Sequence, residues 1–129
     1  MSYILLVEDN QDNANMVIRL LESAKFEVRH ALQGIEGARM ARAEHPALIL
    51  MDFNLPDIDG RTLALQLKKQ LGGAAAPPIV ALTARTGERE MRLAAYFGCT
   101  AFVGKPFVPE ELLNLVKSLA KLPDSQPID

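Results

Sequence analysis

The sequence alternates short apolar runs with longer segments of helical periodicity, and this alternation constrains the fold more than any other feature. Runs of about four to eight apolar residues suit strands that are buried on both faces, as in a parallel sheet. Hydrophobic residues make up 49% of the 129 positions, so one packed domain is expected. Five runs follow one another, the second weaker and alternating in polarity: residues 3–7, 26–30, 48–51, 79–82 and 101–103.

The segments between these runs carry the i, i+3, i+4, i+7 spacing of amphipathic helices. The first helix begins near Asn10 or Asp12, either of which can cap it, and the last opens at Pro109. Five alternations of strand and helix predict an α/β fold, a doubly wound parallel sheet with helices on both faces. The three middle helices are expected at 34–44, 61–71 and 87–97.

Charged and polar residues stand at or close after the ends of four runs. Glu8 and Asp9 follow the first run, Asp52 the third, Thr83 the fourth and Lys105 the fifth. Ligands of doubly wound sheets bind beyond the carboxyl ends of the strands, so these side chains are expected along one rim. Taken singly, each has an ordinary explanation as a helix cap or a solvated side chain. Their shared position is what indicates a site.

Three carboxylates crowded at one rim repel one another. Two unit charges about 4 Å apart interact by on the order of 1 kcal/mol in water, and by about 4 kcal/mol at an effective dielectric constant of about 20. A raised pKa or a bound cation relieves this repulsion, and carboxylate oxygens with several waters suit Mg²⁺ better than zinc. Lys105 and Thr83 add an ammonium and a hydroxyl beside Asp52. Together these groups form a cradle for phosphoryl oxygens, with the carboxylate as nucleophile.

Four blocks of the sequence, in this order, resemble the signature blocks of the response-regulator receiver domain of two-component signalling: "ILLVEDN", "LILMDFNLPDIDG", "IVALTA" and "FVGKPF". The resemblance, to the CheY-like superfamily, runs from about residue 3 to residue 122. It implies a flavodoxin-like fold with strand order 2-1-3-4-5. It also implies a receiver (phosphoacceptor) domain at residues 1–122. The short tail at 123–129 has two prolines and no apolar face, so it is expected to be flexible.

The resemblance also implies a metal site. Asp9 would ligate Mg²⁺ directly, and Glu8 would act mostly through water. Asp52 and the backbone carbonyl of Asn54 would complete the protein's share of the ligands. Mn²⁺ is the alternative ion.

The remaining roles concern the phosphoryl group. Asp52 would be the phosphoacceptor, Thr83 would bond a phosphoryl oxygen, and Lys105 would pair with the phosphoryl group. The bond before Pro106 would be the family's cis peptide, which turns the loop toward the site; such a bond costs about 0.5–1 kcal/mol.

The resemblance places Phe102 at an aromatic switch position, where it would fill the space that Thr83 leaves on phosphorylation. The helix at 87–97, the fifth strand and the last helix would then carry the changed surface to a protein partner. The fourth helix fits this role because its apolar stripe is thin: Met91, Ala94 and Ala95. Asn54 and Arg85 stand where dephosphorylation rates vary in the family.

The expected function is therefore a phosphorylation-activated signalling switch. A histidine kinase or a histidine phosphotransfer protein would supply the phosphoryl group to Asp52. The domain would catalyse only its own phosphorylation and dephosphorylation, so it is not expected to be an enzyme in the usual sense. Its start at Met1, immediately before the first run, favours a stand-alone regulator over a receiver cut from a longer hybrid kinase or regulator.

Two other functions fit parts of the sequence less well. The segment "DIDGRTL" resembles the motif of haloacid-dehalogenase-like phosphatases, but Asp57 follows Pro56 and does not end an apolar run. Asp57 and Asp59 are instead expected to be solvated or to cap the helix that starts near Arg61. A receiver-like scaffold that binds partners without phosphorylation is disfavoured by the complete set of acids, threonine and lysine.

The composition argues against several other classes of partner. The net charge is −2 and there is no tryptophan, so no basic stripe for direct nucleic-acid binding is expected. The apolar runs are too short to span a bilayer, so no membrane partner is expected. Cys99 is the only cysteine, which fits a reducing cytoplasm.

Overall fold

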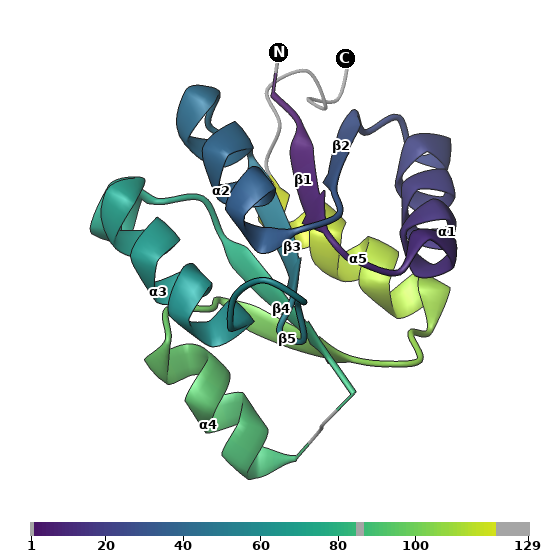
Figure 1. Cartoon of the computed structure of the whole chain (residues 1–129). Coiled ribbons are helices and arrows are strands. Elements are labelled where there is room, and N and C mark those ends of the chain that lie inside the picture. Colours follow the sequence, from purple (N-terminus) through teal and green to yellow (C-terminus); the bar gives the residue numbers. More distant parts are fainter. Residues whose placement is uncertain (1, 85–86, 121–129) are drawn as a thin grey trace.

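The computed structural model describes residues 2–84 and 87–120, which form a five-stranded parallel sheet flanked by helices (Figure 1). The sheet order is β2-β1-β3-β4-β5, so the doubly wound fold and the expected strand order are confirmed. The strands are β1 (Ile4–Val7), β2 (Val28–Ala31), β3 (Leu48–Asp52), β4 (Ile79–Thr83) and β5 (Ala101–Gly104). The helices are α1 (Gln11–Ser23), α2 (Gly34–Ala43), α3 (Gly60–Gln70), α4 (Glu88–Tyr96) and α5 (Pro109–Ala120), with a short 3₁₀ helix at Gly73–Ala75.

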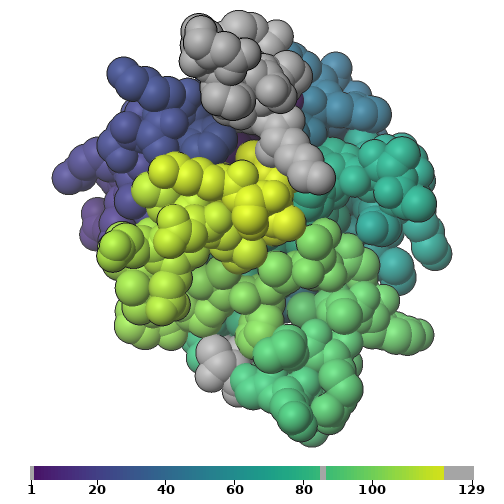
Figure 2. Space-filling view, turned by 180° about the vertical axis from the view of Figure 1, so that it is seen from behind, coloured from purple at the N-terminus to yellow at the C-terminus, as the bar shows by residue number. Residues whose placement is uncertain are grey.

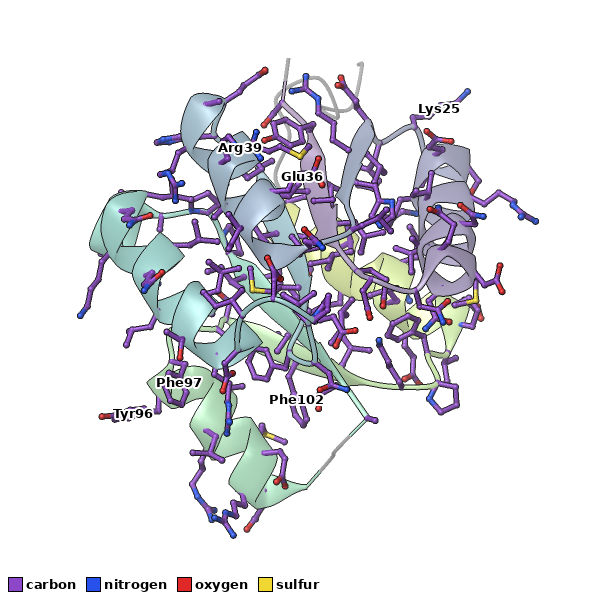
Figure 3. All side chains as sticks on the ribbon, viewed as in Figure 1. Lys25, Glu36, Arg39, Tyr96, Phe97 and Phe102 are labelled. Carbon is purple, nitrogen blue, oxygen red and sulfur yellow. The ribbon has the colours of Figure 1, made fainter. Side chains whose placement is uncertain are left out.

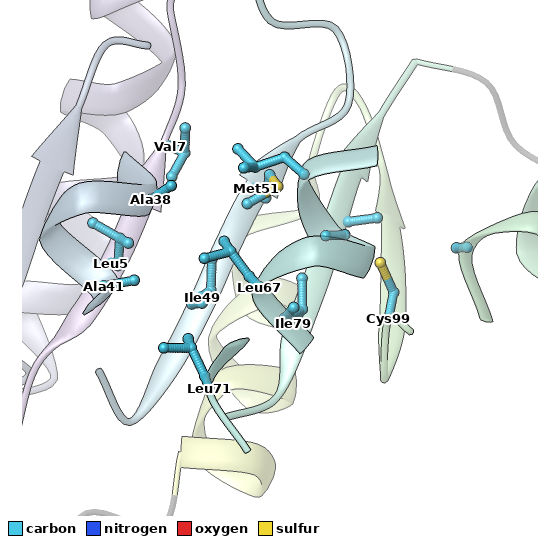
Figure 4. Packing of buried hydrophobic residues seen from close by; sticks show 14 of the residues in the cluster. Leu5, Val7, Ala38, Ala41, Ile49, Met51, Leu67, Leu71, Ile79 and Cys99 are labelled. Atoms are coloured by element: carbon cyan, nitrogen blue, oxygen red, sulfur yellow. The ribbon is translucent and has the colours of Figure 1, made fainter. Parts of the chain in front are cut away.

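The helices form two layers around the sheet. Helices α2, α3 and α4 pack on one face, and α1 and α5 lie side by side on the other, as the view from behind shows (Figure 2). Successive residues of a strand point to opposite faces, so β1, β3 and β4 each supply both hydrophobic clusters. These central strands are buried almost throughout, whereas the edge strands β2 and β5 are mostly half-buried. Figure 4 shows part of the cluster beneath α2 and α3, including Leu5, Val7, Ala38, Ala41, Ile49, Met51 and Leu67.

Three strands extend one residue further than their apolar runs predict. Strand β3 includes Asp52, β4 includes Thr83 and β5 includes Gly104. The sheet ladder continues here because the Phe53 N–H donates to the Leu82 carbonyl over 3.0 Å. The backbone of Asp52 is therefore part of the sheet.

Helix α1 is fixed at both ends by local hydrogen bonds. Of the two predicted caps, Asn10 is the one used, because its Oδ1 accepts the Asn13 N–H over 2.9 Å. At the other end the Phe26 N–H donates to the Leu21 carbonyl over 3.2 Å. Phe26 thus belongs to the turn after α1, and β2 begins two residues later than predicted.

Helix α2 lies close to the sheet because its inward face consists of small residues, namely Gly34, Gly37, Ala38 and Ala41. A Cβ atom at Gly37 would lie 2.7 Å from Cγ2 of Val7 in β1. No larger side chain fits this contact without movement of the helix or the strand.

Helix α4 has less buried surface than the sequence suggests. Of its residues, all within the described part of the chain, Ala94 alone is buried, while Met91 is 53% exposed and Ala95 is exposed. Of the predicted stripe only Ala94 is confirmed as buried; the prediction is wrong for Met91 and Ala95, and Leu93 is half-buried instead. The helix ends before Gly98, whose φ of +92° is the left-handed geometry that glycine tolerates best.

Within the two described ranges, no helix combines the length and apolar character that a membrane span requires. The predicted boundary at residue 122 and the tail at 123–129 lie outside the described residues.

Candidate functional site

The carboxyl ends of β1 and β3 bring three acids together, as predicted. Glu8 and Asp9 follow β1 and Asp52 ends β3, and one carboxylate oxygen from each lies within 4.8 Å of the others. Glu8 and Asp52 are buried, with 1% and 4% of their surface exposed, whereas Asp9 is exposed. We call these three residues, with Lys105, the rim site.

Backbone hydrogen bonds hold the two buried acids in place. The Glu8 N–H donates to the Ala31 carbonyl over 3.1 Å, which extends the pairing of β1 with β2 by one residue. Glu8 Oε2 accepts the Asn10 N–H over 3.2 Å. Asp52 Oδ1 accepts the Asn54 N–H over 2.8 Å. Each carboxylate thus has one oxygen fixed by the loop that follows its own strand.

The other oxygen of each buried acid faces the ammonium of Lys105. Its Nζ lies 2.9 Å from Glu8 Oε1 and 2.9 Å from Asp52 Oδ2. Lys105 is directed there by its own backbone, because its N–H donates to the Thr83 carbonyl over 2.8 Å. The peptide bond between Lys105 and Pro106 is cis, as the resemblance implies.

Burial and charge act in opposite directions on these groups. Burial raises the pKa of Glu8 above its ordinary value, and the hydrogen bonds from Lys105 and Asn10 only partly offset it. Burial lowers the pKa of Lys105, but the hydrogen bonds to Asp52 and Glu8 outweigh it and raise this pKa overall. The ammonium therefore stays charged between the two carboxylates.

The donor set of the rim suits a hard divalent cation. Three carboxylates converge from two strand ends, and the exposure of Asp9 leaves one side open to water. Oxygen ligands combined with retained waters are what Mg²⁺ prefers in proteins. Glu8, Asp9 and Asp52 therefore fit such an ion.

A groove lies beside the rim, between the loop after β3 and helix α4. Its volume is about 540 Å³, and its lining includes Asn54, Thr83, Arg89, Leu93 and Phe102. Thr83 and Phe102 both line this groove because they lie on the neighbouring strands β4 and β5 and face the same side of the sheet. Phe102 is one of the side chains labelled in Figure 3. Arg85, also named from the sequence, lies outside the described residues.

The two acids in the loop after β3 cap helices. Asp59 caps α3 as predicted, because its Oδ1 accepts the Arg61 N–H over 2.9 Å. Asp57 is exposed, as the solvated alternative predicted, but the helix that it caps is α2 and not the predicted helix near Arg61. Asp57 accepts the N–H groups of Gly34 and Ile35, at the start of α2. The local sequence holds no signal for this contact, since the partners are more than 20 positions away.

The position of Asp57 also bears on the phosphatase alternative. Asp57 lies five residues beyond the end of β3, and its carboxylate is engaged by backbone amides of α2. It therefore does not stand at a strand end, where that chemistry would need it.

The fold and the rim site define a flavodoxin-like α/β domain with a candidate cation site at the carboxyl edge of its sheet. Residues 4–117 match the family described as the response regulator receiver domain. The chain belongs to this family of two-component signalling domains.

Curated relatives place the same domain in proteins of very different length. Hybrid signal transduction histidine kinase G of Dictyostelium discoideum is 37% identical over 88% of this chain, which spans 3% of that protein. The transcriptional regulatory protein GltR of Pseudomonas aeruginosa is 33% identical over 92% of the chain, which spans 48% of it. The polar-differentiation response regulator DivK of Brucella ovis is 31% identical over 89% of the chain, which spans 93% of it.

Solved structures agree with this assignment. The chemotaxis protein CheY4 of Vibrio cholerae superposes with a TM-score of 0.84 at 28% identity, covering 92% of this chain and 98% of that one. The receiver domain of sensor histidine kinase PA1611 of Pseudomonas aeruginosa was solved with a magnesium ion in its active site cleft. It superposes with a TM-score of 0.82 at 30% identity, covering 94% of this chain and 98% of that one. The receiver domain of Saccharomyces cerevisiae Ssk1 was solved with the histidine phosphotransfer protein Ypd1. It superposes with a TM-score of 0.84 at 30% identity, covering 92% of this chain and 88% of that one.

Proposed function

We propose that this receiver domain is a phosphorylation-activated switch whose phosphoacceptor is Asp52. A carboxylate oxygen of Asp52 forms a bond to phosphorus as the phosphorus–nitrogen bond of a phosphohistidine breaks; that nitrogen keeps the electron pair, and the histidine leaves as a neutral imidazole protonated on its other ring nitrogen. The observation that carries this proposal is the position of Asp52. It ends a central strand, is buried, and is 2.9 Å from the Lys105 ammonium in a cluster with two further acids.

The neighbouring residues have distinct tasks in this proposal. Glu8, Asp9, Asp52 and the backbone carbonyl of Asn54 would hold Mg²⁺, with Mn²⁺ as the alternative. When bound, such an ion supplies positive charge that offsets the charge on the phosphoryl oxygens.

Two further groups contact the phosphoryl group. Lys105 exchanges its bond to the Asp52 carboxylate for a charge-assisted bond to a phosphoryl oxygen. The Thr83 hydroxyl donates to another phosphoryl oxygen. Thr83 ends β4 and Lys105 follows the end of the neighbouring strand β5, so both groups lie at the same edge of the sheet.

The phosphoryl donor is a phosphohistidine on a histidine kinase or a phosphotransfer protein. Support comes from the Ssk1 receiver domain, which was solved together with a histidine phosphotransfer protein. Two of the relatives named above, a hybrid kinase and a transcriptional regulator, carry the domain within a longer chain. The cytoplasmic location expected from the sequence stays a prediction.

The output is a change in the surface formed by α4, β5 and α5, which a protein partner reads. Thr83 moves toward the phosphoryl group, and Phe102 fills the part of the groove that it leaves. This is supported by the shared groove of the two residues and by the single buried residue of α4. A helix with so little buried surface shifts at low cost.

Intact mass after incubation with acetyl phosphate and Mg²⁺ tests the core of the proposal. The wild-type protein should gain one phosphate, and Asp52→Asn should gain none. Asp12→Asn, an exposed acid in the first turn of α1, is the matched control and should behave like the wild type. An unmodified wild-type protein, or equal modification of Asp52→Asn, would refute the assignment.

A further inference from the structure

The loop formed by residues 53–59, between β3 and α3, is tied to helix α2 by one carboxylate. Asp57 Oδ1 accepts the Gly34 N–H over 2.9 Å, and Oδ2 accepts the Ile35 N–H over 2.9 Å. Within the described part of the chain, Gln33, at the N-cap position of α2, makes no side-chain cap hydrogen bond. The carboxylate of a distant loop thus satisfies amides that a helix start leaves without intrahelical partners.

Packing reinforces this tie. A Cβ atom at Gly34 would lie 2.4 Å from Cγ2 of Ile58, 3.0 Å from Cδ2 of Leu63 and 3.1 Å from Cδ1 of Leu55. Two of these residues belong to the loop, so the start of α2 and loop 53–59 are in direct contact. A side chain at position 34 would force Ile58 to shift, so glycine suits the close approach that accompanies the two hydrogen bonds of Asp57.

The base of the loop is closed against the end of β3. Asn54 and Asp59 form an isolated antiparallel bridge, and the Gly60 N–H donates to the Phe53 carbonyl over 3.2 Å. A Cβ atom at Gly60 would lie 2.5 Å from Cα of Phe53 and 2.7 Å from the carbonyl oxygen of Asp52. The base is therefore compact, and the tip of the loop is fixed by Asp57.

We propose that Asp57 is a positioning residue for the cation site at the rim. By holding loop 53–59 against α2, it keeps the backbone at Asn54 beside the carboxylate of Asp52, where the Asn54 N–H donates over 2.8 Å. This inference rests on the proposed function, because it concerns the same site. It adds that the start of α2 and the cation site are coupled: a bound ion strengthens the tie to Gly34 and Ile35, since coupling between two equilibria is reciprocal.

A Mg²⁺ titration followed by backbone amide NMR tests the first half of the inference. Asp57→Ala should bind Mg²⁺ about tenfold more weakly than the wild type, the lower end of the loss seen when outer supports of metal sites are removed. Glu36→Ala is the matched control, because it removes the same charge from the exposed face of the first turn of α2 and leaves the tie intact (Figure 3). Its affinity should stay within about twofold, because exposed charges are well screened.

Amide exchange of the wild-type protein tests the second half and does not depend on how well the variant folds. Mg²⁺ should slow exchange at Gly34 and Ile35. It should leave exchange unchanged at Lys25, whose N–H donates to the Glu22 carbonyl at the far end of α1.

The outcomes separate this inference from the proposed function. A wild-type protein that does not bind Mg²⁺ overturns both. If the wild type binds Mg²⁺ but Asp57→Ala binds equally well, or Glu36→Ala loses as much affinity, the positioning role of Asp57 is overturned and the cation site stands. If Asp57→Ala does not fold, exchange at Gly34 and Ile35 that is unchanged, or slowed no more than at Lys25, overturns the role; slowed exchange at these two amides with Lys25 unchanged supports it.

Discussion

Lys105 joins two buried carboxylates through one ammonium, and this contact sets the electrostatic balance of the rim. Its Nζ is 2.9 Å from an oxygen of both Glu8 and Asp52. The pKa of Glu8 is nevertheless raised, first of all by burial, so Glu8 is protonated more readily in the folded protein than in the unfolded chain. The negative charge on Glu8 at neutral pH is thus kept at the expense of stability, as is common for residues that serve a function.

This imbalance predicts that Glu8→Gln stabilises the metal-free protein at pH 7. As pH falls through the raised pKa of folded Glu8, the wild type becomes protonated and gains the same stability. The difference in free energy of unfolding between Glu8→Gln and the wild type should therefore narrow as pH falls. It should vanish below pH 4.5, the ordinary pKa of a glutamate. Urea unfolding in the presence of a chelator, at several pH values, measures the gap.

Glu36→Gln is the control for this series. Because Glu36 is exposed, the free energy of unfolding of this variant should stay close to that of the wild type at every pH. A lower stability of Glu8→Gln at pH 7, or a gap that widens toward acid pH, would contradict the prediction.

At the scale of elements, the strands were predictable because a period of two or an unbroken apolar run is a local property. The exact ends of the strands were not predictable in this way. Asp52 and Thr83 lie within β3 and β4 because the ladder to the neighbouring strand continues, and this depends on register. Phe26 is apolar and is therefore predicted to belong to the second strand. It lies instead in the turn that follows α1, and its side chain packs into the core from there.

Helix α2 provides the element-scale prediction. Gly37→Ala improves helix propensity by about 1 kcal/mol. The added Cβ would lie 2.7 Å from Val7 Cγ2, and overpacking of a core contact costs about 1–3 kcal/mol. We expect net destabilisation of about 1 kcal/mol, measured by urea unfolding.

Glu36→Ala, on the exposed face of the same helix, controls for propensity alone and should be within about 0.5 kcal/mol of the wild type. A Gly37→Ala protein as stable as the wild type would show that α2 can move away from β1 at no cost.

At the scale of the whole molecule, the rim and the α4–β5–α5 surface are joined by Thr83 and Phe102, which line one groove. Phosphorylation adds about 1.5 to 2 negative charges at the rim. We expect it to change amide exchange in α4 (Glu88–Tyr96) and β5 (Ala101–Gly104), and to leave the C-terminal half of α1, on the opposite layer, unchanged.

Hydrogen exchange of the wild type with and without acetyl phosphate and Mg²⁺ measures this change. Asp52→Asn under the same conditions controls for effects of the reagents. Identical exchange in α4 and β5 with and without phosphorylation would rule out this route of output.

The order of strands and helices, the carboxyl edge as the position of the site, and the acids gathered there were all predictable from the sequence. These features follow from local periodicity and from the rule that parallel strands end at one edge. The tertiary structure decided which groups touch. In the folded chain the Lys105 ammonium lies between Glu8 and Asp52, and Asp57 caps the start of α2 instead of α3. Such contacts join residues far apart in the chain. They depend on strand register, on the path of loops and on the absence of a side chain at Gly34, and no local pattern in the sequence records them.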